Sequence, residues 1–369
     1  MPSEKKHKLL IVCPHPENTV PGQRLKYEQY FSYFREQGIE VTVRPFMTER
    51  FQAIVYQKGR VPEKIAWTLW GYLKRFLLLF SLRRYDAIYV FLWVTPFGPP
   101  FFERLYSSFS KKMIYDIDDL VYLAEAKSKV NGMVAFLKGR KKPIYLMKKA
   151  NHVITCTPYL DQFVRQFNQH TTDISSTINT ARYRPKSGYA ILNRKLVLGW
   201  SGSHSTSKYV RLLEPVFRRL QQEGLSFRVI VMGDESFALE GIDIEAIPWK
   251  DAHEVEVIER FDIGLYPLPD EPWVYGKSGL KALQYMAIGI PTIAAAIGTN
   301  FRIIRNDETG FLVSNDQEWV DRILQLASSE ELRSRIGTAA AREVEKEYSI
   351  NANKDKYLSI ALNVMNGKS

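Results

Sequence analysis

The chain has 369 residues, 45% of them hydrophobic and 25% charged, which excludes a fibrous or low-complexity chain and predicts two globular domains. Its net charge of +11 is uneven: residues 1–185 hold 29 Lys and Arg against 15 Asp and Glu, whereas the remainder holds 22 against 25. The basic first half indicates an anionic partner, either nucleic acid or an anionic membrane surface, unless it is only a solvated basic face.

The first half alternates short apolar runs with segments of helical spacing. An apolar run of five residues follows Lys8 and ends at Pro14, too short for the core of a signal peptide, so we expect a cytoplasmic protein. The segment 25–38 has helical spacing and ends at a glycine. We expect buried parallel strands at residues 8–13, 39–46, 86–93, 111–119 and 152–157. This order is typical of a doubly wound α/β domain, in which we expect Cys13 and Cys156 to be buried, reduced thiols.

Residues 64–84 combine aromatic and leucine side chains with scattered lysines and arginines. Lys74 and Arg75 interrupt the apolar stretch, which leaves pieces well short of the roughly 20 residues that cross a bilayer. The segment predicts a helix, either in the core or lying on anionic lipid, where it would give the basic half a peripheral contact with the inner face of the cytoplasmic membrane. No recognition motif for nucleic acid accompanies the basic residues, so we expect no nucleic-acid partner.

The second half repeats the α/β pattern after a basic, turn-rich segment at 179–195, which we interpret as a linker. We expect its strands at residues 195–202, 227–234, 244–249, 261–268, 291–296 and 310–314. Two such sheets predict an α/β protein of two Rossmann-like domains facing a central cleft. Ligands of such sheets bind outside the carboxyl ends of the strands, so functional residues are expected in the loops that follow strands.

One loop of the second half has the composition of an anion-binding site. Gly276 and Gly279 let the backbone approach a ligand closely, and the amides of residues 278–280 would open a helix. Lys277 and Lys281 add positive charge at the same place, where it would neutralise a leaving diphosphate. The alternative is a solvated pair of lysines at the start of a helix.

The segment 262–313 resembles the donor-binding half of family-4 glycosyltransferases of GT-B architecture, in which a loop opens a helix, the helix ends in an A-x-G-x-P turn, and G-F-L-V follows. Other segments occur in the family's order, among them GIEVTV, NTARYRP, LGWSG and ELRSRIG. The resemblance implies an acceptor-side domain at 1–185, a donor domain at 186–345, and a C-terminal helix at 346–369 that crosses back to the first domain. It also implies sugar transfer from a nucleotide donor, such as a UDP- or GDP-sugar, with retention at the anomeric carbon and no obligatory cofactor.

The chain departs from the family at two donor-site positions. Gly276 and Gln284 stand where the family has two glutamates with seven residues between them. Gln284 still donates and accepts hydrogen bonds to a ribose diol, whereas glycine cannot replace a carboxylate. The first role would pass to backbone amides, to Lys277, or to Asp270 and Glu271 upstream. The chain therefore resembles a subgroup without the glutamate pair, and the identity of the sugar stays open.

The resemblance also assigns roles outside this loop. Lys208 stands near a lysine that contacts the diphosphate in the family, and Ser203 stands near a partner arginine, although Lys208 could be an ordinary surface lysine. Asp118, in the segment YDIDDL, stands near a histidine that faces the reacting sugar. A helix cap is the alternative for Asp118, and we expect no metal site despite the Asp-x-Asp spacing. Arg24 follows a glycine in a loop that resembles the family's flexible glycine loop.

The predicted catalytic residues are therefore Asp118, Lys208 and Lys277. The predicted donor-binding residues are Gly22, Arg24, Gly202, Ser203, Trp249, Gly276, Ser278, Gly279, Leu280, Lys281 and Gln284. The resemblance implies a retaining glycosyltransferase, and the basic first half favours a glycan or lipid-linked acceptor, which we expect in bacterial envelope polysaccharide synthesis. A nucleotide-sugar epimerase resembling UDP-GlcNAc 2-epimerase would instead need no acceptor, and a non-catalytic nucleotide-sugar-binding partner is the third possibility because both glutamates are replaced.

Overall fold

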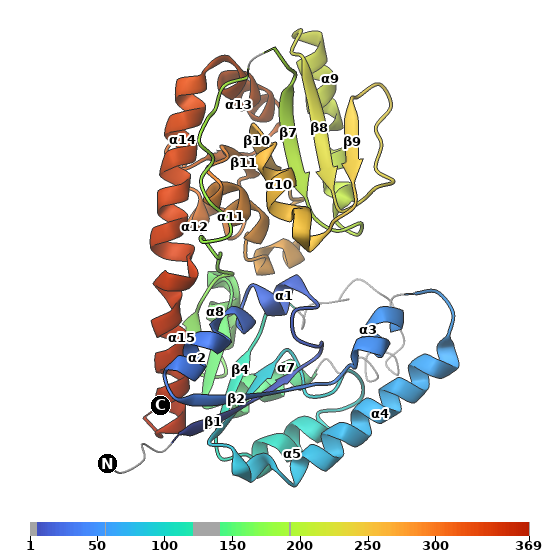
Figure 1. Cartoon of the computed structure of the whole chain (residues 1–369), viewed down its shortest axis with the longest axis vertical. Coiled ribbons are helices and arrows are strands. Elements are labelled where there is room, and N and C mark those ends of the chain that lie inside the picture. The colour runs from blue at the N-terminus through green and yellow to red at the C-terminus, as the bar shows by residue number, and fades with distance from the viewer. Residues whose placement is uncertain (1–5, 56, 121–140, 192, 369) are drawn as a thin grey trace. The chain divides into compact units, whose positions relative to one another are not determined.

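The computed structural model describes residues 6–55, 57–120, 141–191 and 193–368. It divides into two compact units, one formed by residues 1–175 and 353–369 and the other by residues 176–352 (Figure 1). These limits differ from the expected boundaries at 185 and 345. The difference arises because the strand-like segment after residue 175 bonds to the second unit, where Ile178 N donates to Tyr348 O over 2.8 Å.

The first unit is built on a parallel six-stranded sheet in the order β2-β1-β3-β4-β5-β6. Its strands are β1 His7–Cys13, β2 Ile39–Pro45, β3 Ala87–Phe91, β4 Met113–Asp116, β5 His152–Thr155 and β6 Thr171–Asp173. Its helices are α1 Pro21–Arg24, η1 Glu28–Tyr30, α2 Phe31–Glu36, α3 Glu49–Val55, α4 Val61–Leu79, η2 Leu82–Arg84, α5 Phe101–Phe109, α7 Lys141–Lys149, α8 Pro158–Val164 and α15 Ile350–Met365. The five predicted strands are confirmed, and Cys13 and Cys156 are buried free thiols. The edge strand β6 was not predicted, because its three polar residues carry no apolar pattern.

The helix predicted at 25–38 is wrong as a single element. The segment divides into η1 and α2, and α1 precedes it. The buried side chain of Gln23 accepts from His15 N over 3.0 Å and donates to Glu28 Oε1 over 2.9 Å. These bonds turn the chain between α1 and η1, so tertiary contacts override the helical spacing.

The second unit contains a parallel six-stranded sheet in the order β12-β11-β10-β7-β8-β9. Its strands are β7 Leu196–Ser201, β8 Phe227–Met232, β9 Ile244–Ile247, β10 Ile263–Tyr266, β11 Thr292–Ala295 and β12 Phe311–Val313. Its helices are η3 Ser207–Leu213, α9 Glu214–Gln222, η4 Asp251–His253, α10 Glu254–Glu259, η5 Pro272–Gly276, α11 Leu280–Ala287, α12 Asn300–Ile303, α13 Asp316–Ser328, α14 Glu330–Glu343 and the π-helix η6 Val344–Tyr348. All six predicted strands are confirmed, and so is the predicted α/β architecture.

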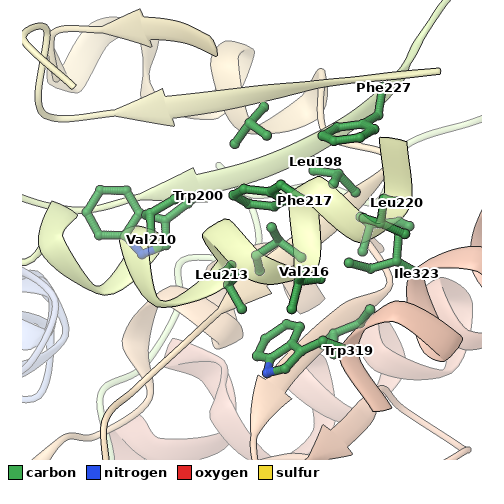
Figure 2. Close-up of a cluster of buried hydrophobic side chains, with 14 of the residues drawn as sticks. Leu198, Trp200, Val210, Leu213, Val216, Phe217, Leu220, Phe227, Trp319 and Ile323 are labelled. Atoms are coloured by element: carbon green, nitrogen blue, oxygen red, sulfur yellow. The ribbon is translucent and has the colours of Figure 1, made fainter. Parts of the chain in front are cut away.

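The core of the second unit holds its sheet against α9 and α13. Trp200 and Leu198 of β7 pack with Phe217 of α9 and Trp319 of α13 (Figure 2). Burial of large apolar side chains of this kind contributes about 1.5–3 kcal/mol each. The carboxyl end of β7, which leads into a predicted site loop, is thereby fixed.

The last helix, α15, belongs to the first unit from Asn353 onward. Tyr357 of α15 stacks on Tyr30 with ring centroids 4.5 Å apart, and Tyr33 Oη donates to Asp355 Oδ1 over 2.5 Å. Over the described residues, the structure contains no helix that is both long and apolar enough to cross a membrane.

Candidate functional site

The strand order of the second unit predicts where a ligand binds. β7 lies between β10 and β8, so the chain leaves β7 on one side and returns to it through β10 on the other. The crevice outside the carboxyl ends of two such strands is the usual ligand site of a doubly wound sheet. The loop after β7 contains Gly202 and Ser203, and the segment after β10 contains Gly276 and Lys277. Predicted donor residues from both loops therefore border this point.

Lys281 lies in the first turn of α11 and reaches toward the β7 loop. Its Nζ is 4.4 Å from the centre of the Trp200 ring and 3.3 Å from Thr206 Oγ1. Burial, together with the positive charge of Lys277, lowers the pKa of Lys281 from 10.5 to about 7. Within the part of the chain that the structure describes, no carboxylate forms an ion pair with Lys281. The site thus holds a desolvated cation that a bound anion would stabilise.

Two stacked aromatic rings join the other predicted lysines. The Trp273 and Tyr209 ring centroids are 5.5 Å apart, with 28° between the ring planes. Lys277 Nζ lies 5.3 Å from the Trp273 ring, and Lys208 Nζ lies 5.4 Å from the Tyr209 ring. Cation–π contacts of this kind hold the two ammonium groups beside one aromatic pair. Two lysines that are far apart in the sequence are therefore brought together.

Glycine is required at two predicted positions. A Cβ on Gly202 would lie 2.2 Å from the Trp200 side chain and 2.6 Å from Lys281 Nζ, so no larger residue fits there. Gly279 is the N-cap of α11 with φ +75°, a left-handed conformation, and a Cβ there would lie 2.4 Å from Ile303. We call Lys208, Lys277 and Lys281 the lysine cluster. Gly202 and Gly279 keep side-chain atoms away from the backbone after β7 and before α11, in the two segments that carry this cluster.

The β7 loop is anchored by a carboxylate at the end of β8. Asp234 accepts from Ser207 Oγ over 2.6 Å and from Ser236 Oγ over 2.7 Å, and His204 Nδ1 lies 3.0 Å away. These hydrogen bonds hold the pKa of Asp234 well below its usual range. Asp234 therefore fixes the loop that carries Ser203.

Gln284 lies in a buried polar network rather than at the surface. Its Nε2 donates to Tyr183 Oη over 2.8 Å, and Tyr183 Oη donates to Glu254 Oε2 over 2.5 Å. Nε1 of Trp249, a predicted donor-binding residue, donates to Glu254 Oε1 over 2.8 Å. The predicted residues Gln284 and Trp249 are thus joined through Tyr183 and Glu254, which the sequence patterns did not identify. They carry no glycine or lysine signal, and they are 71 residues apart.

Ser278 contacts a residue from the start of the second unit. Its Oγ is 2.7 Å from Ser176 Oγ. The contact ties the turn before α11 to the segment that leads into the second unit. Leu280 begins α11, which ends at Ala287 as predicted.

The remaining predicted residues lie in the first unit. A Cβ on Gly22 would be 3.5 Å from Asp118 Oδ2, so these two residues are neighbours. Arg24, predicted in a flexible loop, lies in the last turn of the short helix α1. Asp116, the first carboxylate of YDIDDL, is buried in an ion pair with Lys26, whose Nζ lies 2.6 Å from Oδ1. In the described ranges, no three His, Cys, Asp or Glu side chains are arranged to hold a metal ion.

A comparison with protein families finds a match within the second unit. Residues 195–329 match the family model described as glycosyl transferases group 1. This segment is therefore similar to glycosyl transferases of group 1. The matched segment contains Gly202, Gln284 and the three lysines Lys208, Lys277 and Lys281, so the candidate site lies within it.

Curated relatives match a shorter part of the chain. Glycosyltransferase 1 domain-containing protein 1 of Xenopus tropicalis is 35% identical over 90 residues, and trehalose synthase of Pyrococcus horikoshii is 36% identical over 90 residues. Each match covers 24% of this chain, but only 26% and 21%, respectively, of those proteins.

Solved structures share the whole architecture at low identity. Sucrose-phosphate synthase of Thermosynechococcus elongatus has a TM-score of 0.73 and 15% identity, covering 98% of this chain and 100% of its own. HepE of Anabaena, in complex with UDP and glucose, has a TM-score of 0.62 and 14% identity, covering 96% and 99%. The fold is therefore GT-B, with two Rossmann-like sheets and a C-terminal helix.

Proposed function

We propose that this protein is a retaining glycosyltransferase that moves a sugar from a nucleotide-sugar donor to a hydroxyl acceptor. The observation that carries the proposal is Lys281, a desolvated lysine without an ion pair among the described residues, in the segment that matches the group 1 glycosyl transferases. A buried charge is costly unless a partner neutralises it. The diphosphate of a nucleotide sugar supplies that partner.

The diphosphate would be bound by the lysine cluster and by the amides of residues 278–280. In this chain Ser203 stands where the family pattern has an arginine, and Lys281 Nζ reaches the adjoining Gly202. We infer that Lys281 supplies the cation that Ser203 does not. Lys277 and Lys208 would neutralise the charge that develops on the leaving diphosphate.

The ribose would be bound by Gln284. Its Nε2 is engaged by Tyr183, which leaves the amide oxygen to accept from a ribose hydroxyl. Glu254 holds Tyr183 and Trp249, and so positions both ends of this network. The family pattern has a glutamate where this chain has Gln284. Here the nearest carboxylate of the network is that of Glu254, which is connected to Gln284 through the hydroxyl of Tyr183.

The proposed reaction needs no enzymatic nucleophile. The acceptor oxygen bonds to the anomeric carbon on the face from which the diphosphate leaves, and the bonding electron pair departs with the phosphate oxygen. That oxygen takes the acceptor proton. Asp118 would orient the acceptor hydroxyl, beside the loop of Gly22 and Arg24. Orientation and the cationic cluster would then account for catalysis.

The donor would be a UDP- or GDP-sugar, a choice supported for UDP by the HepE complex. The acceptor would be a glycan or a lipid-linked glycan of bacterial envelope polysaccharide synthesis, because the basic first half suits an anionic acceptor or membrane. We also propose that the protein acts in the cytoplasm, with the first unit in peripheral contact with an anionic membrane surface.

Assays with UDP-, GDP- and ADP-sugars test the proposal. Transfer to a glycan acceptor, with the product retaining the donor's anomeric configuration, is the expected result. Conversion of the nucleotide sugar without acceptor would identify an epimerase instead. Tight binding without turnover, with any acceptor, would identify a non-catalytic binding protein, for which the replacement of both family glutamates is the supporting observation.

A further inference from the structure

The outer surface of α4 is apolar along its whole length. Eight large hydrophobic side chains are exposed there, led by Phe80 at 74% and Leu69 at 64%. They recur at helical spacing over five turns and fall on one face. The exposed residues are Val61, Ile65, Leu69, Trp70, Leu73, Phe76, Leu77 and Phe80. We call this surface the α4 face.

Two cationic side chains of α4 are bonded to backbone oxygens of the first unit instead. Arg75 is buried and donates to three backbone oxygens, those of Cys13, Arg44 and Val94, over 2.7–2.8 Å. Lys74 Nζ donates to Pro45 O over 3.1 Å, and burial lowers its pKa to about 8. An ordinary surface helix buries its apolar side and exposes its charges. In α4, by contrast, Arg75 is buried while eight large apolar side chains of the segment 61–80 are exposed.

The apolar surface continues onto α5, which lies beside α4 in the first unit (Figure 1). The Tyr72 and Phe102 ring centroids are 5.6 Å apart, and Phe101 packs against Phe102 at 5.6 Å. Tyr72 Oη also donates to Phe97 O over 2.8 Å. Phe97 and Phe101 are themselves exposed, so they extend the α4 face.

Positive charges border this surface. Arg83 and Arg84 follow α4 and are exposed, and Arg104 is exposed on α5. The nearby acidic residue Glu63 is already paired with Arg60, whose Nη2 lies 2.7 Å from its Oε2. The border is therefore cationic, in a half of the chain with 29 basic and 15 acidic residues.

We propose that the α4 face inserts into the interface of an anionic lipid membrane, with α4 parallel to the membrane plane. A 19-residue helix is about 28 Å long, far longer than a small-molecule site. Its exposed arc has no hydrogen-bonding group except Trp70 Nε1, whose ring suits the headgroup region. Apolar insertion plus a cationic border is the arrangement that binds anionic lipid. This extends the membrane contact proposed above to a named surface and does not depend on the sugar-transfer reaction.

Co-flotation of the full chain with lipid vesicles tests the proposal. We expect binding to phosphatidylcholine vesicles that contain phosphatidylglycerol, and at least about tenfold weaker binding to pure phosphatidylcholine. The triple variant Leu69→Gln, Leu73→Gln and Phe76→Gln should bind more than about tenfold more weakly, because it removes inserted apolar surface. The matched control Leu212→Gln with Phe301→Gln changes exposed apolar residues of the second unit and should bind as the wild type does.

Two further measurements keep the test valid if the triple variant fails to fold. The variant Arg83→Gln with Arg84→Gln alters only exposed charges, and it should weaken binding to anionic vesicles by roughly tenfold or more. Brominated lipid should quench tryptophan fluorescence in the wild type, and Trp70→Phe should remove most of that quenching. Equal binding to neutral and anionic vesicles, or unchanged binding of the triple variant, would overturn the proposal.

Light scattering without lipid measures whether the protein is a monomer or a dimer, and so tests whether a second copy of the chain covers the α4 face instead of a membrane. A monomer that binds vesicles supports the membrane surface. A dimer that the triple variant abolishes would show that the α4 face pairs two copies of the chain and would overturn it. Failure of vesicle binding leaves sugar transfer to a soluble acceptor unaffected, so the two proposals fail separately.

Discussion

Replacing Lys281 by Met should stabilise the empty protein while removing donor binding. A fall in pKa from 10.5 to about 7 corresponds to roughly 5 kcal/mol, at about 1.36 kcal/mol for each tenfold change in proton affinity. Lys281 is half-buried, so solvent screens part of this cost, and we expect a gain of about 1–3 kcal/mol near pH 7. Methionine retains the apolar stem over Trp200 without the charge.

The sign of the effect depends on pH. The pKa of Lys281 is lower in the folded than in the unfolded chain, so the unfolded chain binds more protons between about pH 7 and 10.5. The cost of the lysine is therefore fully present below about pH 7 and fades as the pH rises toward 10.5. The stabilisation by Met should shrink over the same interval.

Thermal and urea unfolding at pH 6.5 and pH 9.5, without nucleotide, measure this difference. The control Lys149→Met removes an exposed lysine of the first unit and should leave stability within about 0.5 kcal/mol. Calorimetric titration with UDP- and GDP-sugars should show donor binding lost in Lys281→Met and kept in the control. A variant that is destabilised, or that binds donor like the wild type, would refute the reasoning about a buried cation awaiting an anion.

The other predictions concern the same domain. Donor affinity should weaken by about ten- to thirtyfold from pH 6.5 to 8.5, because Lys281 loses its proton near pH 7, and Lys281→Arg should flatten this profile; a flat wild-type profile would count against the assignment. Lys277→Ala should lower turnover by about a hundredfold or more with unfolding unchanged, and near-normal transfer would remove Lys277 from the cation cluster. Tyr183→Phe should cost about 1–3 kcal/mol of stability and raise the KM for donor more than it lowers kcat, because Gln284 and Glu254 lose a shared partner; an unchanged KM would separate this network from the ribose.

Local patterns were sufficient for the sheets and for the loop before α11. Buried parallel strands are continuous apolar runs in the sequence. The glycines and lysines at 276–281 directly indicate a tight turn and a positively charged loop. The family resemblance then gave order to these pieces, and the match of residues 195–329 supports it.

Tertiary contacts determined what the sequence could not show. The spacing at 25–38 favours one helix, but the bonds of Gln23 to His15 and Glu28 divide it. Residues 64–84 were equally compatible with core and interface, because periodicity identifies an apolar face without saying which way it points. The exposure of the apolar side chains and the burial of Arg75 show that this face points outward.

Tertiary contacts also determine the properties of the site residues. Lys281 was predicted as one of two lysines at a helix start, but it contacts Trp200 of β7 and Thr206 of the loop after β7, which are distant in the sequence. Tyr183 and Glu254 were not predicted, since a polar network across 71 residues has no local signature.

The most direct test of the proposed donor site is a crystal structure of the protein with a UDP- or GDP-sugar. We predict that a phosphate oxygen lies within hydrogen-bond distance of Lys281 Nζ, that the amides of residues 278–280 face the diphosphate, and that the ribose contacts Gln284. A nucleotide sugar bound elsewhere, with Lys281 still contacting only Trp200 and Thr206, would contradict this prediction.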